Sequence, residues 1–142
     1  MPNSALKGAL ESLTKNYKYV LIDSPAGLEH LNRRITSKVN DVFDILDHSQ
    51  KSFNHVQRAY RIAKEVDIQF DNFYIIGGYR FPKKLGNEAE TALKFKYLGK
   101  IASDEQLDEC VLAGKSLLDL PSDSAAYVSV KEIMKNAGYI QQ

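Results

Sequence analysis

The chain has 142 residues, of which 44% are hydrophobic and 26% are charged, and its formal net charge is +1. This composition is typical of one globular domain, expected here to span residues 1–142, and it excludes a disordered or fibrous chain. Because the charge is nearly balanced, neither nucleic acid nor a membrane surface is expected as a partner.

The one cysteine, Cys110, excludes a disulfide within the chain and indicates a reducing compartment, so a cytoplasmic location is expected. A lone cysteine is more often a small buried hydrophobic residue than a ligand. No apolar stretch reaches the roughly 18 residues needed to span a bilayer. The N-terminal residues lack the apolar core of a signal peptide, and none is expected.

The first predicted element is a helix, because Leu6, Leu10 and Leu13 recur at the spacing of a buried helical stripe, with Asn3 or Ser4 as its cap. Strands are predicted over residues 17–23, 42–46, 72–76 and 97–101. Helices are predicted over residues 31–39, 52–66, 87–94, 104–113 and 124–136, with a loop at 24–30.

The order of these elements predicts the fold class, because strands alternate with helices and each strand is a short, continuous apolar run. That pattern is typical of right-handed β-α-β units. We therefore expect an α/β fold with a mostly parallel sheet covered by helices on both faces. Asp104 is expected to cap its helix, and Gly114 and Gly138 are expected to end the last two helices.

The loop after the first predicted strand carries the clearest functional pattern. The apolar run YVLI ends at Asp23, and the small residues Ser24, Pro25, Ala26 and Gly27 follow. In open parallel sheets, ligands bind beyond the carboxyl ends of the strands, where a carboxylate can hold the Mg²⁺ of a nucleotide. A glycine there lets the backbone approach a phosphate closely. The alternative is a purely structural role, in which Asp23 only caps the following turn.

The longer string DSPAGLEHLNRR resembles the D-x-x-A-G-x-E-H-x-x-R segment of the MinD/ParA-type ATPases, in the branch that matures carbon monoxide dehydrogenase. The matching residues are Asp23, Ala26, Gly27, Glu29, His30 and Arg33. The resemblance covers nearly the whole chain and includes residues 47–49 after the second predicted strand. It also includes the run from residue 97 to Gly138.

This resemblance implies ATP-dependent metallocentre assembly, with nickel insertion into a metalloenzyme client. Mg-ATP would be the cofactor, with Asp23 holding the Mg²⁺ and Ala26 and Gly27 sensing the γ-phosphate. The resemblance implies further roles for residues that contact the nucleotide base or the dimer partner. Tyr79, Ser103 and Asp104 would lie beside the base, and Glu29, His30 and Arg33 would couple the switch to a homodimer face.

The family's glycine-rich lysine loop has no counterpart near the N-terminus, where the first thirty residues contain only Gly8 and Gly27 as glycines. The Gly-Lys-Ser at residues 114–116 follows a predicted helix and has Glu109 where the phosphate-binding loop has its first glycine. We therefore expect the C-terminal half of such an ATPase, a partial P-loop NTPase fold without the P-loop strand. In the family that strand lies between those ending here at Asp23 and Asp47. These two would then pair directly or receive a strand from another chain. We therefore expect that the isolated chain is weakly stable or that it needs an obligate partner.

ATP hydrolysis by this chain alone is not expected, because the phosphate cradle is not encoded. The turn Gly77-Gly78-Tyr79-Arg80 also departs from the family, which often has an asparagine there to recognise adenine. Tyr79 would stack on the base instead.

Three alternatives remain open at the level of sequence. The chain would be a non-catalytic interaction module that pairs with an ATPase or a metalloenzyme, or a receiver-like flavodoxin-type domain. A metal cluster would use His48 and His55 with Asp44 and Asp47, although no tight ligand spacing supports it.

Overall fold

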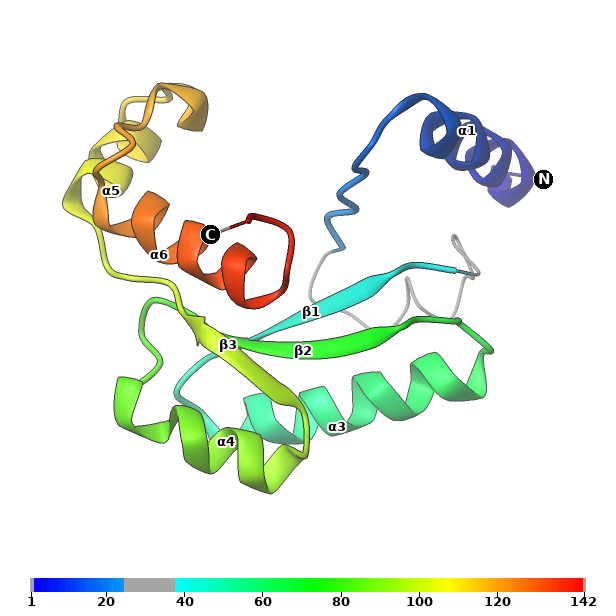
Figure 1. The fold of residues 1–142 in the computed structure, drawn as a ribbon, viewed down its shortest axis with the longest axis horizontal. Coiled ribbons are helices and arrows are strands. Elements are labelled where there is room, and N and C mark those ends of the chain that lie inside the picture. The colour runs from blue at the N-terminus through cyan, green and yellow to red at the C-terminus, as the bar shows by residue number, and fades with distance from the viewer. Residues whose placement is uncertain (1, 25–37, 142) are drawn as a thin grey trace. The chain divides into compact units, whose positions relative to one another are not determined.

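The computed structural model describes residues 2–24 and 38–141 (Figure 1). Its long elements are α1 (Pro2–Asn16), β1 (Asp41–Leu46), α3 (Gln50–Glu65), β2 (Asn72–Gly77), α4 (Gly86–Leu93), β3 (Lys96–Lys100), α5 (Glu105–Leu112) and α6 (Ala125–Asn136). Two short 3-10 helices are η1 (Lys83–Leu85) and η2 (Leu117–Asp119). The chain forms two compact units, residues 1–42 with 57–72 and residues 43–56 with 73–142. The prediction of a single domain stays a prediction.

The sheet has three parallel strands in the order β1-β2-β3 (Figure 1). Tyr74 of β2 is in register with Lys96 of β3, and Ile75 with Tyr97. The α6 helix lies against β3 on one face of the sheet, and α4 lies against β3 on the other (Figure 1). The predicted α/β class, with a parallel sheet and helices on both faces, is therefore confirmed.

The central strand β2 is buried from Phe73 to Gly77, as expected for a parallel strand covered on both faces. Alternate side chains of a strand point to opposite faces, so its residues divide between two cores. The core under α6 contains Tyr74, Ile76, Leu98 and Ile133, with Phe43, Ile101, Met134 and Ala137 packed against it. The opposite side contains Phe81, fully buried, whose ring lies 6.4 Å from that of Phe53 and 6.0 Å from that of Tyr97.

The predicted strand over residues 17–23 is wrong in this structure. Residues 17–24 follow α1 outside any helix or strand, and their side chains are exposed, with Leu21 at 89%. A strand exists only where its backbone groups pair with a neighbour, and the three described strands pair with one another. An apolar run alone cannot supply that partner.

Two helix boundaries also differ from the prediction. The α1 helix begins at Pro2, so Asn3 and Ser4 lie inside it and are not its caps. Proline suits the first helical position because its φ is already helical and its missing N–H needs no partner. Of the predicted helix over 31–39, residues 31–37 lie outside the described residues. Lys38 instead forms a parallel bridge with Gln69, and the Val39 N–H donates to the Gln69 carbonyl at 2.9 Å.

Three helix ends in the second half agree with their predicted signals. Asp104 is the N-cap of α5, as predicted. Ser124, predicted as the first residue of the last helix, is the N-cap of α6. Gly114 and Gly138 follow these helices with φ of +62° and +87°, a region that favours glycine because it has no Cβ. None of the described helices combines the length and the apolar composition needed to cross a bilayer.

Candidate functional site

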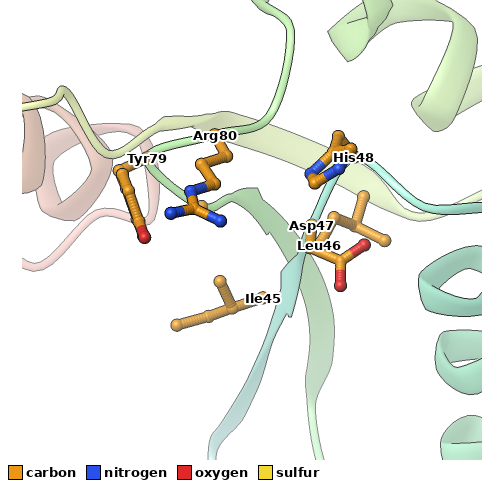
Figure 2. A pocket seen from close by; sticks show the side chains of 7 residues that line it. Ile45, Leu46, Asp47, His48, Tyr79 and Arg80 are labelled. Carbon is orange, nitrogen blue, oxygen red and sulfur yellow. The ribbon is translucent and has the colours of Figure 1, made fainter.

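The carboxyl ends of β1 and β2 meet at an open pocket of about 320 Å³ (Figure 2). The pocket is lined by Ile45, Leu46, Asp47, His48, Gly78, Tyr79 and Arg80. The first four follow one another through the end of β1, and the last three form the turn after β2. This edge of a parallel sheet is where α/β proteins bind ligands, because helices and loops leave a crevice there.

Asp47 provides a fixed negative charge at the pocket. Its Oδ1 accepts the Ser49 N–H at 2.6 Å, and its own N–H donates to Ser52 Oγ at 3.0 Å. These hydrogen bonds from Ser49 hold the pKa of Asp47 below its ordinary value, because they favour the ionised form. The loop between β1 and α3 is therefore ordered by hydrogen bonds of Asp47, a residue that also lines the pocket.

The turn after β2 is held at both ends. The Gly78 N–H donates to the Leu46 carbonyl at 2.7 Å, and the Phe81 N–H donates to the Gly78 carbonyl at 2.9 Å. The Tyr79 carbonyl accepts from Lys100 Nζ at 2.9 Å and from Ser103 Oγ at 3.4 Å. The backbone that carries Tyr79 is thus fixed by contacts to β1 and to the end of β3.

Two planar side chains extend from this turn into the pocket region. The Tyr79 ring is 55% exposed, and the Arg80 guanidinium lies 5.2 Å from its centroid (Figure 2). Neither of the ion pairs found in the described part of the chain involves Arg80. The pocket therefore offers a planar cation and an aromatic face, which suit an anionic or aromatic ligand.

Ser103 and Asp104, both predicted to lie beside a base, occupy different environments. Ser103 is brought to Tyr79 through the hydrogen bond just described. Asp104 Oδ1 accepts the N–H groups of Gln106 and Leu107, and its Oδ2 accepts the Ala126 N–H at 2.7 Å. The bond from Ala126, with those from α5, lowers the pKa of Asp104 against an opposing effect of desolvation. Both oxygens therefore join α5 to α6, and a nucleotide contact by Asp104 stays a prediction.

The predicted switch residues are not part of the described site. Asp23 is exposed and belongs to the unit formed by residues 1–42 and 57–72, whereas the pocket residues belong to the other unit. Ala26, Gly27, Glu29, His30 and Arg33 lie outside the described residues. The magnesium and switch roles assigned to these residues stay predictions.

Sequence reasoning gave no nucleotide-binding role to Asp47, His48 or Arg80, and it considered Asp47 and His48 only for the alternative metal cluster, although all three line the pocket. A signal for them exists in the sequence, because each follows the carboxyl end of a predicted strand. The order of strands in the sheet was needed to show that these two ends are neighbours. The alternative metal cluster finds no support, since no three His, Cys, Asp or Glu side chains come together within residues 2–24 and 38–141.

No protein-family model matches the chain. The chain is 31% identical over 133 residues to an uncharacterized ATP-binding protein of Methanocaldococcus jannaschii. The aligned region covers 92% of this chain and 53% of that protein. It is 28% identical over 108 residues to the carbon monoxide dehydrogenase accessory protein CooC of Rhodospirillum rubrum. This aligned region covers 76% of this chain and 41% of CooC. The chain thus spans about half the length of the curated relatives it matches.

Solved structures of other proteins have a similar fold. The MinD cell division protein of Aquifex aeolicus matches with a TM-score of 0.77 and 18% identity, over 99% of this chain and 62% of that one. A ParA family ATPase from Chlorobium tepidum TLS matches with a TM-score of 0.53 and 18% identity, over 78% of this chain and 42% of that one. The fold is therefore that of the MinD/ParA-type P-loop ATPases, a Rossmann-like α/β fold.

Proposed function

We propose that this chain is part of an ATP-binding switch protein of the MinD/ParA type, with nucleotide held at the carboxyl ends of β1 and β2. The observation that carries the proposal is the pocket at the carboxyl edge of the sheet. The 31% identity of the chain to an ATP-binding protein supports the assignment of nucleotide to this pocket. The carboxyl edge of a parallel sheet is the ligand-binding edge of this class of folds.

The residues present fit part of a nucleotide. Arg80 offers a guanidinium, whose paired donors match phosphate oxygens, and Tyr79 offers a ring face for a base. A Cβ added at Gly78 would come within 3.1 Å of the Leu46 carbonyl oxygen, so the glycine lets the turn lie close against the end of β1. Bound Mg²⁺ would screen the phosphate charge, and Asp23 is the residue we assign to its hydration shell.

The remaining switch roles belong to the same proposal. Ala26 and Gly27 would contact the γ-phosphate, and Glu29, His30 and Arg33 would report it to a second copy of the chain in a homodimer. The chain alone is proposed to bind nucleotide without hydrolysing it, because its Gly-Lys-Ser sequence, residues 114–116, follows α5 and has Glu109 where a phosphate-binding loop has its first glycine.

The cellular role we propose is metallocentre assembly of the carbon monoxide dehydrogenase maturation type, with nickel as cargo and a metalloenzyme as client. Its support is the 28% identity to the CooC accessory protein and the Asp-Ser-Pro-Ala-Gly-Leu-Glu-His string. The described residues hold no group of three metal-ligating side chains, so the proposal places nickel ligation outside them.

Isothermal titration with Mg-ATP tests the proposal. Binding in the millimolar range or tighter is expected, and Arg80→Ala should weaken it by roughly tenfold, in line with one lost charge-assisted contact. Asp23→Ala should weaken Mg-ATP binding while leaving Mg-free ATP binding unchanged. Arg61→Ala is the matched control, because Arg61 lies on α3 with its side chain 69% exposed. A folded protein that binds no ATP at millimolar concentration refutes the proposal.

A second candidate function is a non-catalytic interaction module that binds a second copy of itself. The observation in its favour is the exposed apolar run after α1, where Leu21 is 89% and Ile22 is 43% exposed. Analytical ultracentrifugation should then show concentration-dependent self-association that Leu21→Asp reduces. Leu118→Asp is the control, since Leu118 is 95% exposed in η2. Equal sedimentation of all three proteins as monomers would exclude this candidate.

A further inference from the structure

We infer that Lys100 is a positioning residue for the anion-binding part of this pocket, because its ammonium fixes the turn that carries Arg80. The inference rests on the proposed nucleotide-binding function, and it adds a residue of β3 to a site formed by the ends of β1 and β2. Lys100 is not among the lining residues, so its effect on a phosphate group passes through Arg80.

The end of β3 brings the Lys100 side chain to this turn. Lys100 is the register partner of Gly77, the last residue of β2, and the Ile101 N–H donates to the Gly77 carbonyl at 2.8 Å. A Cβ added at Gly77 would lie 2.9 Å from Lys100 Cβ, so the glycine leaves the space in which the lysine side chain begins. Two residues beyond Gly77, the Tyr79 carbonyl accepts from the lysine ammonium at 2.9 Å.

This hydrogen bond restrains the backbone of Arg80 directly. The Tyr79 carbonyl belongs to the peptide group that joins Tyr79 to Arg80, so fixing its oxygen fixes the direction in which Arg80 leaves the turn. Ser103 Oγ donates to the same oxygen at 3.4 Å, which makes the bond from Lys100 the shorter of the two. The Arg80 guanidinium lies 5.2 Å from the centroid of the Tyr79 ring, so the ring restrains it further (Figure 2).

The contact is better suited to preparing a ligand site than to stabilising the fold. Neither ion pair found within residues 2–24 and 38–141 involves Lys100, and its ammonium bonds to a main-chain carbonyl. Ordering a long lysine side chain costs rotamer entropy comparable to the gain from one charge-assisted hydrogen bond. A turn that is already ordered, however, spares a phosphate ligand the cost of ordering it. Affinity then depends on the fraction of molecules in which Arg80 has the binding geometry.

Isothermal titration with Mg-ATP and with magnesium tripolyphosphate measures the contribution of Lys100. Lys100→Met removes the donor and should weaken both ligands by about fivefold, as expected if the binding-competent turn falls to about a fifth of the molecules. Lys100→Arg keeps a charged donor and should bind both within about twofold of the wild type. Lys96→Met is the matched control, because Lys96 lies on the same strand and donates to the Asn136 carbonyl at 3.1 Å without lining the pocket.

A double-mutant cycle distinguishes positioning from an independent contribution. In the Arg80→Ala background, Lys100→Met should cause no further loss of affinity, because the residue that it positions has already been removed. If Lys100 acted on the phosphate independently, the tenfold and fivefold losses would multiply to about fiftyfold in the double variant. The absence of a further loss is also a result that general destabilisation of the fold does not produce.

Circular dichroism shows which variants remain folded. If Lys100→Met unfolds, Lys100→Gln replaces it in the same cycle, since its amide nitrogen ends one atom short of the lysine ammonium. Unchanged affinity in the folded variant, or a multiplicative loss in the double variant, overturns the inference and leaves the proposed function in place. Failure of the wild-type protein to bind either Mg-ATP or tripolyphosphate overturns the proposed function together with the inference.

Discussion

The backbone N–H of Gly78 donates to the carbonyl oxygen of Leu46 at 2.7 Å, which joins the turn after β2 to the end of β1. This bond lies among the residues that line the pocket, so the pocket depends on main-chain geometry as well as on side chains. The same turn reaches into the core through Phe81, three residues further along the chain. The stability of the core and the shape of the pocket are therefore linked.

Phe81 is the residue at which this link is tested. Its ring is fully buried and contacts those of Phe53 and Tyr97. Phe81→Ala should lower the free energy of unfolding by about 3–5 kcal/mol, because the transfer of the ring is lost and a cavity remains. Urea denaturation measures this change. Tyr127→Ala, at an exposed site, should alter it by less than about 0.5 kcal/mol. Equal effects of the two substitutions would contradict the assigned core.

Gly86 is predicted to tolerate no side chain. A Cβ there would lie 2.4 Å from Tyr97 Cε1 and 2.9 Å from its Cδ1, inside contact distance of a packed ring. Gly86→Ala should therefore destabilise the protein by about 1–3 kcal/mol, the usual range for overpacking. Thermal unfolding measured by circular dichroism gives the change.

Gly8 provides the control for this substitution, because a Cβ added there meets no atom within 4 Å. Gly8→Ala in α1 should leave stability unchanged or raise it by up to about 1 kcal/mol, since alanine has the higher helix propensity. The packing at Gly86 would be misassigned if both alanine variants unfolded at the same temperature as the wild type.

Asp104 should make the junction of α5 and α6 sensitive to acid. Hydrogen bonds, first from Ala126, lower its pKa below the ordinary value of 3.8. Because the folded-state pKa lies below the unfolded-state value, its stabilisation is present above pH 3.8 and is lost as the pH falls through the folded value. Asp104→Asn should therefore lower the melting temperature at pH 7, and the difference from wild type should shrink on acidification.

Melting curves between about pH 2 and pH 7 measure this dependence. Asp123→Asn is the comparison, because Asp123 is an exposed carboxylate just before the N-cap of α6. If the gap between wild type and Asp104→Asn were independent of pH, the carboxylate would not be the source of the stabilisation.

Asp44 should have the opposite dependence on pH. Burial raises its pKa above 3.8, and attraction to His55 partly opposes this. Because the folded-state pKa exceeds the unfolded-state value, the ionised carboxylate destabilises the fold at neutral pH, and this effect disappears as the pH falls below 3.8. Asp44→Asn should be more stable than the wild type at pH 7, with a gap that closes toward acid.

Nuclear magnetic resonance titration of the Asp44 carboxyl carbon provides a direct measurement. His55→Gln should raise the pKa of Asp44 further, because the opposing attraction is removed. A pKa of Asp44 below 3.8 in the wild type would show that the carboxyl is not desolvated.

Local signals were sufficient wherever a short segment decides the structure. Asp104 caps its helix as the sequence indicates, because a cap needs only the two or three N–H groups that follow it. The glycines after α5 and α6 end those helices for an equally local reason. The buried run before Gly77 formed β2 because two neighbouring strands were present to pair with it.

The apolar run ending at Ile22 illustrates the limit of this reasoning. Its composition matches that of β2, yet residues 17–24 remain outside any strand. Strand formation requires a pairing partner that may be distant in sequence or absent from it, and composition contains no information about that partner.

The sequence by itself determined the N-cap of α5, the positions of β1, β2 and β3 and the α/β class, because each follows from neighbouring residues and apolar periodicity. Only the tertiary structure decided that Asp47 and Arg80, which are separated by a helix and a strand, face one pocket. It also decided that Asp104 joins two helices through one carboxylate. Contacts of this kind depend on which strands are neighbours, and that order is fixed by packing of the whole sheet.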